Sequence, residues 1–457
     1  MAFSTVHFLC FFLLFLGLPA ARVTNASVDP CNAFSDGSGD LSVIPIYAKC
    51  SPFAADHGGS LLDTVVKMSS NDPHRLNYLT SLVAGKPNPN SVPIGSGNQL
   101  LHTGNYVVRA KLGTPPQLMF MVLDTSSDAA WAPCTGCSGC PSAATAEVNP
   151  NSSSTFSSLS CSTAQCAQAR GLTCPSSTTA SPSPAACSFN HTYGGGSAFS
   201  AALVEDTLAL SSDEIPGFAF GCITAVTSGG ASIPPQGLLG LGRGPMSLMT
   251  QTTSLYSGVF SYCLPSFRSF YFSGSLKLGR AGQPGSIKTT PLLKNPHRPS
   301  LYYVNLTGVS VGRTRVPVDP KYLGFDPNTG AGTIVDSGTV ITRFVQPVYE
   351  AIRDEFRKQV KGPFSTLGAF DTCFTADNAD NAAPKITLHM TGLDLTLPME
   401  NSLIHSSAGS LSCLSMASAP NNVDSVLNVI ANLQQQNLRI LFDVPNSRIG
   451  IAYENCN

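Results

Sequence analysis

The sequence has little charge, a single tryptophan and no long apolar run beyond its N-terminus. Charged residues make up 12% of the 457 residues, and the 26 Lys and Arg nearly balance the 27 Asp and Glu. Such a composition offers no basic surface, so it argues against nucleic acids and anionic membranes as partners. A membrane-spanning helix needs about 20 apolar residues. Because no later run is that long and the C-terminus lacks a hydrophobic tail, we expect no membrane anchor.

An apolar run does stand at the N-terminus, from Phe8 to Leu18, and small residues follow it. The run is too short to span a bilayer, and its position is typical of a secretory signal peptide over residues 1–21. We therefore expect a secreted protein in the extracellular space, with a vacuole as the alternative destination. In an exported chain, four Asn-x-Ser/Thr sequons are candidates for glycosylation: Asn25, Asn151, Asn190 and Asn305.

Cysteine usage agrees with export. Of the 15 cysteines, Cys10 falls in the signal peptide and two more precede residue 95, which leaves twelve, an even number that six disulfides would use. Seven of these twelve lie between Cys134 and Cys187. They belong to an insertion, residues 132–190, with so few large apolar side chains that disulfides must hold it together. Because seven is odd, at least one bridge should leave the cluster.

Two motifs suggest other chemistry and are set aside. The spacing Cys134-x-x-Cys137-x-x-Cys140 also occurs in zinc and thiol-redox sites, but export and the lack of a nearby His in the sequence favour disulfides. The glycines from Gly237 to Gly244 are not followed by the Lys-Ser/Thr of a phosphate-binding loop. We therefore expect no metal and no cofactor.

Residues 22–95 differ from the rest of the chain. From Leu61 to Val83 the apolar residues recur at roughly helical spacing. The breaker cluster Gly85–Asn90 then suits an exposed linker. This layout predicts a prosegment over residues 22–95 that is removed on maturation, and an ordinary helical N-terminal extension is the alternative.

From Asn105 onward the pattern is that of a mostly β protein. Strands are predicted on both sides of a turn at residues 113–116, and the second strand ends at Asp124. Another strand, residues 332–335, ends at Asp336. One helix is predicted where Pro347 is followed by Val348, Ile352, Phe356 and Val360.

The two aspartate segments form an internal repeat. Met121–Ser127 and Thr333–Thr339 each consist of an apolar strand, an Asp, a hydroxyl residue, a small residue and another hydroxyl residue. Downstream, Leu238–Gly240 and Val429–Ala431 form a second matching pair. A duplication of this kind predicts two similar lobes, which we place at residues 96–291 and 292–457.

Paired carboxylates suit the hydrolysis of peptide bonds. The reaction needs a base to activate water and an acid to protonate the carbonyl oxygen or the leaving amine. Two carboxylates about 3 Å apart cannot both ionise, so one pair shares a proton and supplies both functions. Hydroxyl and backbone donors would hold the carboxylates in place. The repeat therefore makes Asp124 and Asp336 the candidate catalytic residues.

On these motifs the sequence resembles the pepsin-like aspartic proteases, and among them the secreted plant branch with nepenthesin-like and nucellin-like enzymes. The resemblance runs from about Tyr106 to Cys456. It implies a bilobal, mostly β fold whose cleft holds a protein or peptide substrate in an extended conformation, and an apoplastic, monomeric enzyme. It also implies residue roles: Asp124 and Asp336 as the catalytic pair, Thr125, Ser127, Ser337, Gly338 and Thr339 as supports, Trp131 as the active-site aromatic residue, and Tyr193 as the flap residue.

The resemblance has two departures near the catalytic turns. Ser126 and Ala431 stand where the family usually has Gly, although each keeps its backbone N–H. The expected function is a secreted aspartic endopeptidase made as a zymogen. The alternative is a catalytically silent, protease-like protein that binds or inhibits a partner; such relatives often lose the second aspartate, whereas Asp336 is present here.

Overall fold

The computed structural model divides the chain into two units, Met1–Ser35 and Asp36–Asn457, and every described residue lies in the second. The signal peptide, Asn25 and Tyr193 lie outside the described residues. The structure describes residues 41–45, 61–70, 72–73, 76, 79–80, 106–140, 147–168, 172–174, 185–192, 198–227, 237–267, 274–297, 299–375, 383–406, 411–420 and 425–456.

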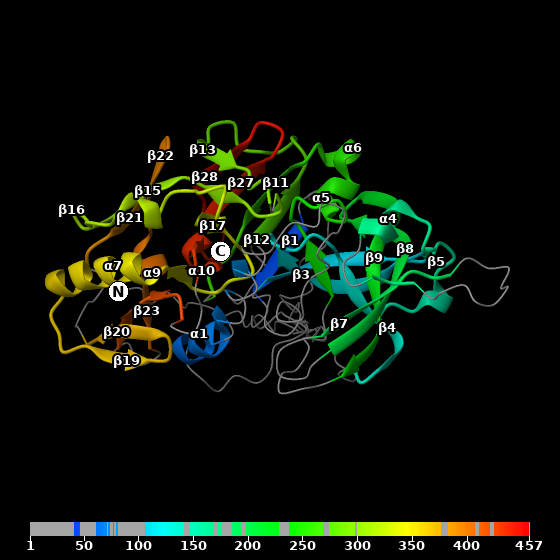
Figure 1. Ribbon diagram of the computed structural model, residues 1–457, viewed down its shortest axis with the longest axis horizontal. Helices are drawn as coiled ribbons and strands as arrows, with labels where there is room; N and C mark the ends of the chain where they lie inside the picture. The colour runs from blue at the N-terminus through cyan, green and yellow to red at the C-terminus, as the bar shows by residue number, and fades with distance from the viewer. Residues whose placement is uncertain are drawn as a thin grey trace, which may run out of the picture. The chain divides into compact units, whose positions relative to one another are not determined.

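Six antiparallel strands of a 20-stranded sheet, here called the six-stranded sheet, join the two halves of the chain (Figure 1). Their order is β13-β28-β27-β11-β12-β1, with β1, β11 and β12 from the first half, β27 and β28 from the second, and β13 at the boundary between them. The bounds are β1 Leu41–Pro45, β11 Val259–Cys263, β12 Gly274–Leu278, β13 Lys288–Leu293, β27 Leu438–Asp443 and β28 Arg448–Tyr453. Alternating apolar residues pack beneath it, and the rings of Phe260 and Phe442 stack with centroids 4.5 Å apart.

The first half builds a strand hairpin and a long strand pair. The predicted hairpin is confirmed as β2 (Tyr106–Leu112) and β3 (Gln117–Asp124), paired antiparallel. β8 (Ala198–Leu210) and β9 (Asp213–Thr227) pair along most of their length. The other elements are β4 Trp131–Ser138, η2 Pro150–Ser152, β5 Ser157–Ser158, α4 Ala164–Gln168, β6 Leu172–Thr173, β7 Ser188–Thr192, β10 Leu238–Gly240, α5 Leu248–Gln251 and α6 Thr253–Tyr256.

The second half repeats this scheme and adds two four-stranded sheets, β16-β15-β21-β22 and β19-β20-β24-β23. The elements are β14 Tyr303–Val304, β15 Leu306–Val311, β16 Thr314–Arg315, η4 Pro320–Tyr322, β17 Gly332–Val335, β18 Thr342–Phe344, β19 Ser365–Leu367, β20 Phe370–Phe374, β21 Ile386–Met390, β22 Leu393–Thr396, α9 Met399–Ser402, β23 Leu403–His405, β24 Ser412–Leu414, β25 Met416–Ser418, β26 Leu427–Ile430 and α10 Asn432–Gln435.

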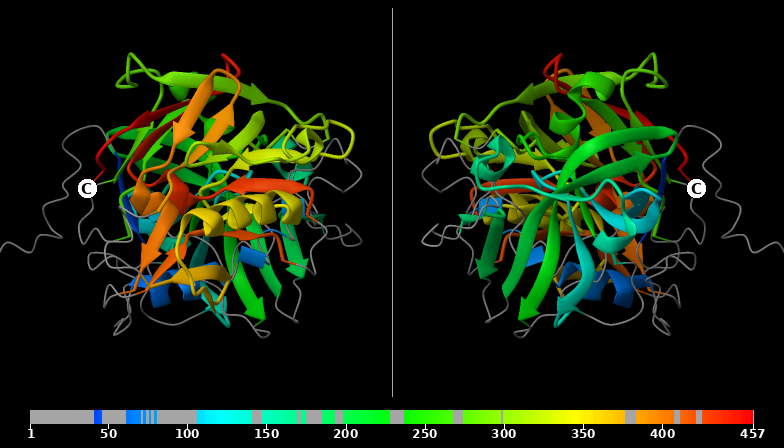
Figure 2. Two further views of the ribbon diagram at one scale, coloured as in Figure 1. Left: turned by 90° about the vertical axis from the view of Figure 1, so that its left-hand side faces the viewer. Right: turned by 90° about the vertical axis from the view of Figure 1, so that its right-hand side faces the viewer.

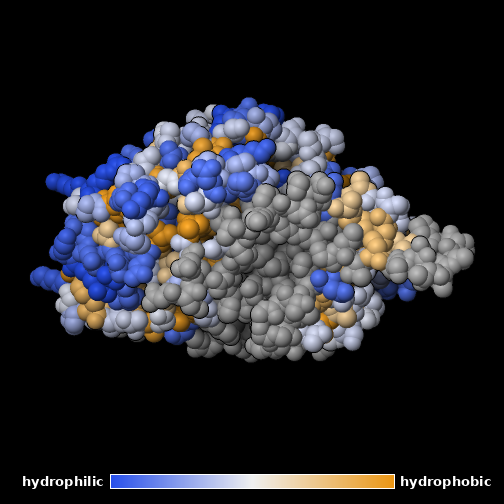
Figure 3. Space-filling view, in the orientation of Figure 1, coloured by the Kyte–Doolittle hydropathy of each residue, from blue (hydrophilic) through white to orange (hydrophobic). Residues whose placement is uncertain are grey.

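The predicted helix is confirmed as α7, Gln346–Gln359, with Pro347 in its first turn. Its buried side chains, Val348, Tyr349, Ile352 and Phe356, recur at helical spacing. They turn toward β15, β18 and β25, which the helix contacts (Figure 2, yellow). Its other face is charged, and hydrophilic residues gather over this part of the molecule (Figure 3). Among the described residues, no helix combines the length and apolar character needed to cross a membrane.

Six disulfides use the twelve cysteines from Cys134 onward, as the even count predicted. One of them, Cys134–Cys222, leaves the Cys-rich insertion and ties it to β9. The others are Cys137–Cys140, Cys161–Cys174, Cys166–Cys187, Cys263–Cys456 and Cys373–Cys413.

Part of the expected prosegment is helical. α1 spans Leu61–Ser69. Helical residues recur further along the predicted stretch, at Asp72, Pro73, Leu76, Leu79 and Thr80. Within the same expected prosegment, β1 pairs with both β2 and β12, so its Val43 and Ile44 are fully buried.

Candidate active site

Asp124 is the last residue of β3 and is fully buried. Its Oδ1 accepts hydrogen bonds from the backbone N–H of Ser126 (2.9 Å) and from the Ser126 hydroxyl (3.1 Å). Its Oδ2 accepts one from the hydroxyl of Ser127 (2.9 Å). Ser126, the first departure from the family motif, therefore keeps the backbone donor and adds a second donor to the same oxygen.

Asp336 follows β17 directly and is also fully buried. Its Oδ1 accepts from the backbone N–H of Gly338 (3.3 Å), and its Oδ2 accepts from the hydroxyl of Thr339 (2.5 Å). Each carboxylate is thus held by a backbone donor from the small residue and a hydroxyl from the residue after it. Because each buried carboxylate accepts such bonds, its orientation is fixed.

The two aspartate loops are hydrogen-bonded to each other. The N–H of Thr125 donates to Oγ of Ser337 (3.2 Å), and the N–H of Ser337 donates to Oγ1 of Thr125 (3.0 Å). The Ser337 hydroxyl also donates to the carbonyl of Leu123 (3.0 Å). These reciprocal bonds join residues that are far apart in sequence and bring the two predicted catalytic loops together.

The second pair of repeat elements lies beside the aspartate strands. β10 runs parallel to β3, with Gly240 opposite Asp124, and β26 runs parallel to β17, with Ile430 opposite Val335. Ala431 follows β26 and is the counterpart of Gly240 in this register.

The two positions differ in how much room they leave. A Cβ on Gly240 would lie 2.3 Å from the carbonyl oxygen of Ala129, so only glycine fits there. Ala431, by contrast, is buried with ordinary extended dihedrals (φ −91°, ψ 173°), and its N–H donates to the hydroxyl of Thr342 (3.1 Å). The second departure from the family motif is therefore accommodated.

Trp131 begins β4 and lies opposite Leu238 of β10. It is buried, and its indole Nε1 has no hydrogen-bond partner among the described residues. The flap residue Tyr193 lies outside the described residues, but the strands on either side, β7 and β8, pair as a hairpin.

Three of the predicted glycosylation sequons are described. Asn190 on β7 and Asn151 in η2 are exposed, while Asn305 between β14 and β15 is partly buried. Asn190 accepts a hydrogen bond from the hydroxyl of Ser200 (2.6 Å), and Asn305 donates one to Thr391 (2.8 Å).

A buried chain of hydrogen-bonded side chains reaches the backbone carbonyl of Asp336. The sequence analysis did not predict it. Tyr262 donates its hydroxyl to Oε1 of Gln435. Gln435 in turn donates from Nε2 to the backbone carbonyls of Ile430 (2.8 Å) and Asp336 (3.2 Å). Burial and the charge of Asp336 raise the pKa of Tyr262 well above its usual range, so the phenol stays a neutral donor. The sequence showed only a run of amides at 434–437, whose partners lie far away in the chain.

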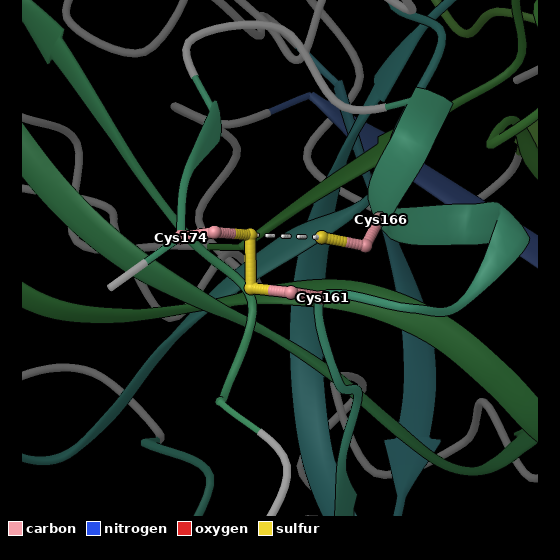
Figure 4. Close-up of side chains that lie close together, drawn as sticks. All are labelled: Cys161, Cys166 and Cys174. Carbon is pink, nitrogen blue, oxygen red and sulfur yellow. Dashed lines mark hydrogen bonds between the residues drawn. A yellow bond between two sulfur atoms is a disulfide. The ribbon is translucent and has the colours of Figure 1, made fainter. Parts of the chain in front are cut away.

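Cysteine sulfurs from three positions, Cys161, Cys166 and Cys174, cluster in the insertion (Figure 4). Cys161 is bridged to Cys174 and Cys166 to Cys187, and the sulfurs of Cys166 and Cys174 lie 4.0 Å apart. Metal ligation requires thiolates, whereas these sulfurs are joined in disulfides. The cluster is therefore a pair of neighbouring bridges.

The fold and this site define the class of protein to which the chain belongs. Two family models match the chain, one described as xylanase inhibitor N-terminal over residues 106–280 and one as xylanase inhibitor C-terminal over residues 301–453. Together with the relatives below, they show that the chain belongs to the plant branch of the pepsin-like aspartic protease family.

Among curated relatives, aspartyl protease AED3 of Arabidopsis thaliana is 73% identical over 100% of both chains. Aspartyl protease 25 of Oryza sativa subsp. japonica is 53% identical over 87% of this chain and 92% of its own. Aspartic proteinase nepenthesin-1 of Nepenthes gracilis is 35% identical over 77% and 78%.

Solved structures confirm the fold. Basic 7S globulin from soybean matches with a TM-score of 0.58 at 20% identity, over 76% of this chain and 93% of that one. The structure titled edgp matches with a TM-score of 0.59 at 21% identity, over 81% and 96%. The predicted mostly β, pepsin-like architecture is thus confirmed.

Proposed function

We propose that the protein is a secreted aspartic endopeptidase that hydrolyses peptide bonds of protein substrates through Asp124 and Asp336. The observation that carries this proposal is the reciprocal pair of hydrogen bonds between Thr125 and Ser337. It brings together two loops that each present a buried, oriented carboxylate. The names of the relatives, at up to 73% identity, support the same assignment.

The proposed hydrolysis of the peptide bond follows from the two carboxylates, Asp124 and Asp336. Two adjacent buried carboxylates hold one proton between them, as in aspartic proteases generally. The ionised member removes a proton from a water molecule, and the water attacks the peptide carbonyl. The protonated member donates to the carbonyl oxygen, and a proton then passes to the leaving amine. We assign substrate contact to the flap residue Tyr193, and Trp131 is the active-site aromatic residue of this proposal.

The export route belongs to this proposal. The signal-like run at residues 1–21, the six disulfides and the exposed sequons at Asn151 and Asn190 favour an oxidising compartment. We propose the extracellular space as the destination, with a vacuole as the alternative. We also propose that the chain is made as a precursor and is cut between the N-terminal segment and the lobes.

The test is an activity assay on the full chain with two substitutions. The protein is acidified and incubated with a denatured protein substrate across roughly pH 3 to 6, where a shared-proton pair works best. Asp336→Asn removes one carboxylate of the pair. Asp354→Asn is the matched control, because its side chain lies exposed on α7. Cleavage by the parent and the control, lost in Asp336→Asn, is the expected result.

The two family models are described as parts of a xylanase inhibitor. This description supports the alternative function, a catalytically silent protein that binds or inhibits a partner. A processed, folded chain that cleaves nothing at any pH would overturn the endopeptidase proposal. The same preparation would then be tested as an inhibitor of xylanases.

A further inference from the structure

The described residues of the N-terminal segment from Leu61 to Thr80, here called the docking segment, pack against the C-terminal lobe. In Figure 1, α1 lies beside β23, which it contacts. Two apolar clusters form between segment and lobe. The first joins Leu62, Val65 and Met68 to Val340, Ile341, Phe370, Ile404, Ala417 and Leu433. The second joins Leu76 and Leu79 to Leu301, Tyr303, Ile334, Ala419, Leu427 and Val429.

Asp72 in this segment holds the loop that carries the second catalytic aspartate. Its buried carboxylate accepts hydrogen bonds from the backbone N–H groups of Val340 (3.0 Å) and Ile341 (3.2 Å). The preceding residue, Thr339, donates its hydroxyl to Asp336. The docking segment therefore fixes the same stretch of backbone that orients a catalytic carboxylate.

Arg343 completes this contact. Its Nε lies 3.7 Å from Asp72, and the two side chains are only 5% and 3% exposed. Its Nη2 donates to the carbonyl of Ser69 in the docking segment (3.3 Å), and Nη1 donates to that of Ser418 (3.1 Å). If the segment left, Arg343 would lose its counter-ion and two loop N–H groups would lose their acceptor. Both losses disfavour departure.

The electrostatics favour docking in acid. Burial raises the pKa of Asp72 to about 6, with the charge of Asp336 adding to the rise, while Arg343 and the two N–H groups oppose it. Burial also lowers the pKa of Arg343, and Asp72 and Tyr349 oppose that change. Because the docked carboxyl binds a proton more tightly than a free one, acidification stabilises the docked state.

We propose that the docking segment stays bound to the C-terminal lobe after the chain is cut between Thr80 and Tyr106, and that Asp72 remains a positioning residue of the active enzyme. This departs from the expectation that residues 22–95 are removed, and it rests on the proposed function. The partner of this lobe surface is thus a peptide of the same chain, anchored by one buried carboxyl and a row of apolar residues.

The experiment places recognition sites for a site-specific protease in the full chain, one between Pro45 and Leu61 and one at Gly85–Asn90. After cutting, the protein is passed through a gel-filtration column at about pH 4 and about pH 7. All six described disulfides lie within residues 134–456, so co-elution would report non-covalent binding. We expect the docking segment to elute with the lobes, and to be held more tightly at the lower pH.

Variants separate the role of Asp72 from general packing. Asp72→Ala removes the acceptor of both loop N–H groups and should raise the dissociation rate of the segment by about tenfold or more, whereas Asp72→Asn should remove the difference between the two pH values. Asp354→Asn, at the exposed position of α7 already used as a control, should behave like the parent. Removing the bound segment with mild denaturant should lower kcat, and adding a synthetic 61–80 peptide should restore it. The same peptide with Asp72→Ala, which lacks the acceptor for the two loop N–H groups, should restore far less.

Two outcomes separate this inference from the proposed function. A segment that leaves at about pH 4, with undiminished cleavage by the remaining enzyme, would overturn the inference while the function stands. A segment that stays bound to a protein without any cleavage activity would uphold the docking and overturn the endopeptidase assignment.

Discussion

Trp131 and Arg343 occupy equivalent positions in the two halves of the chain. Trp131 lies opposite Leu238 of β10, and Arg343 lies opposite Val429 of β26, in antiparallel register in both cases. The duplicated scheme therefore places an indole ring in one lobe and a guanidinium group in the other. Only the guanidinium needs a counter-ion, and Asp72 of the docking segment provides it.

The first prediction concerns this ion pair. Arg343→Gln should lower the free energy of unfolding by about 3 kcal/mol near pH 7, because it leaves the buried Asp72 without its counter-ion. Adding Asp72→Asn should recover about half of the loss, since an amide carries no charge. Urea unfolding of the parent, both single variants and the double variant gives the coupling energy. Strictly additive effects would show that the two residues do not interact.

The same carboxyl predicts how stability depends on pH. Asp72 has a pKa of about 6 in the folded chain against 3.8 for an unperturbed Asp, so the folded state binds more protons between these values. Its contribution is therefore fully present below about pH 4 and is lost as the pH rises through about 6, by an amount on the order of 2–3 kcal/mol. Denaturant unfolding across this range should show the decrease in the parent, and Asp72→Asn should show a flatter profile.

Ser337→Ala tests the link between the catalytic loops. The change removes the acceptor for the Thr125 N–H and the donor to the Leu123 carbonyl, and unfolding should become easier by about 1–3 kcal/mol. Because the spacing of the two carboxylates is then less fixed, kcat/KM should fall by about tenfold or more. Ser158→Ala, at an exposed position of β5, is the control. Unchanged kinetics in a destabilised Ser337→Ala protein would contradict the positioning role.

Ser126→Gly restores the residue that is usual in the family. It removes the hydroxyl that donates to Asp124 at 3.1 Å but keeps the backbone donor. Because a hydrogen bond to an ionised carboxylate favours the charged form, the acid limb of the kcat/KM profile should move upward by about half a pH unit. Ser126→Ala should shift it equally, since the hydroxyl and not the Cβ is responsible. A shift in the glycine variant alone would point to backbone flexibility.

Two disulfides offer a matched comparison of loop length. Cys134–Cys222 closes a separation of 88 residues, and Cys137–Cys140 closes one of 3. Replacing both cysteines by serine should cost about 4–5 kcal/mol for the long loop and about 1.5 kcal/mol for the short one, if chain entropy dominates. Thermal unfolding of the two double variants measures the difference. Equal losses would assign the effect to folded-state packing instead.

Local patterns in the sequence were sufficient for much of the fold. The β2–β3 hairpin, α7 and the strand before Asp336 follow from alternation, helical spacing and turn residues, all of which act between near neighbours in the chain. The family motif added the expected roles of Thr125 and Ser337, and the structure shows these two residues joined across the loops. An even count of cysteines predicted six bridges but could not give their pairing.

Long-range partners were beyond sequence reasoning. Nothing near Asp72 or Arg343 in the sequence indicates that the two meet, because Asp72 stands between Asn71 and Pro73 and Arg343 between Thr342 and Phe344. Likewise, the five residues of β1 carry no signal that they complete the six-stranded sheet. Ala431 departs from the motif, and only the neighbouring backbone decides whether its methyl group fits.

The bridge between Cys263 and Cys456 spans 193 residues and joins β11 to the end of the chain. A single cut at any peptide bond inside that span leaves both pieces covalently attached. Such a nicked molecule would run at its full mass on a non-reducing gel and would keep its gel-filtration volume. Cleavage of this protein between Cys263 and Cys456 can therefore be followed only after reduction.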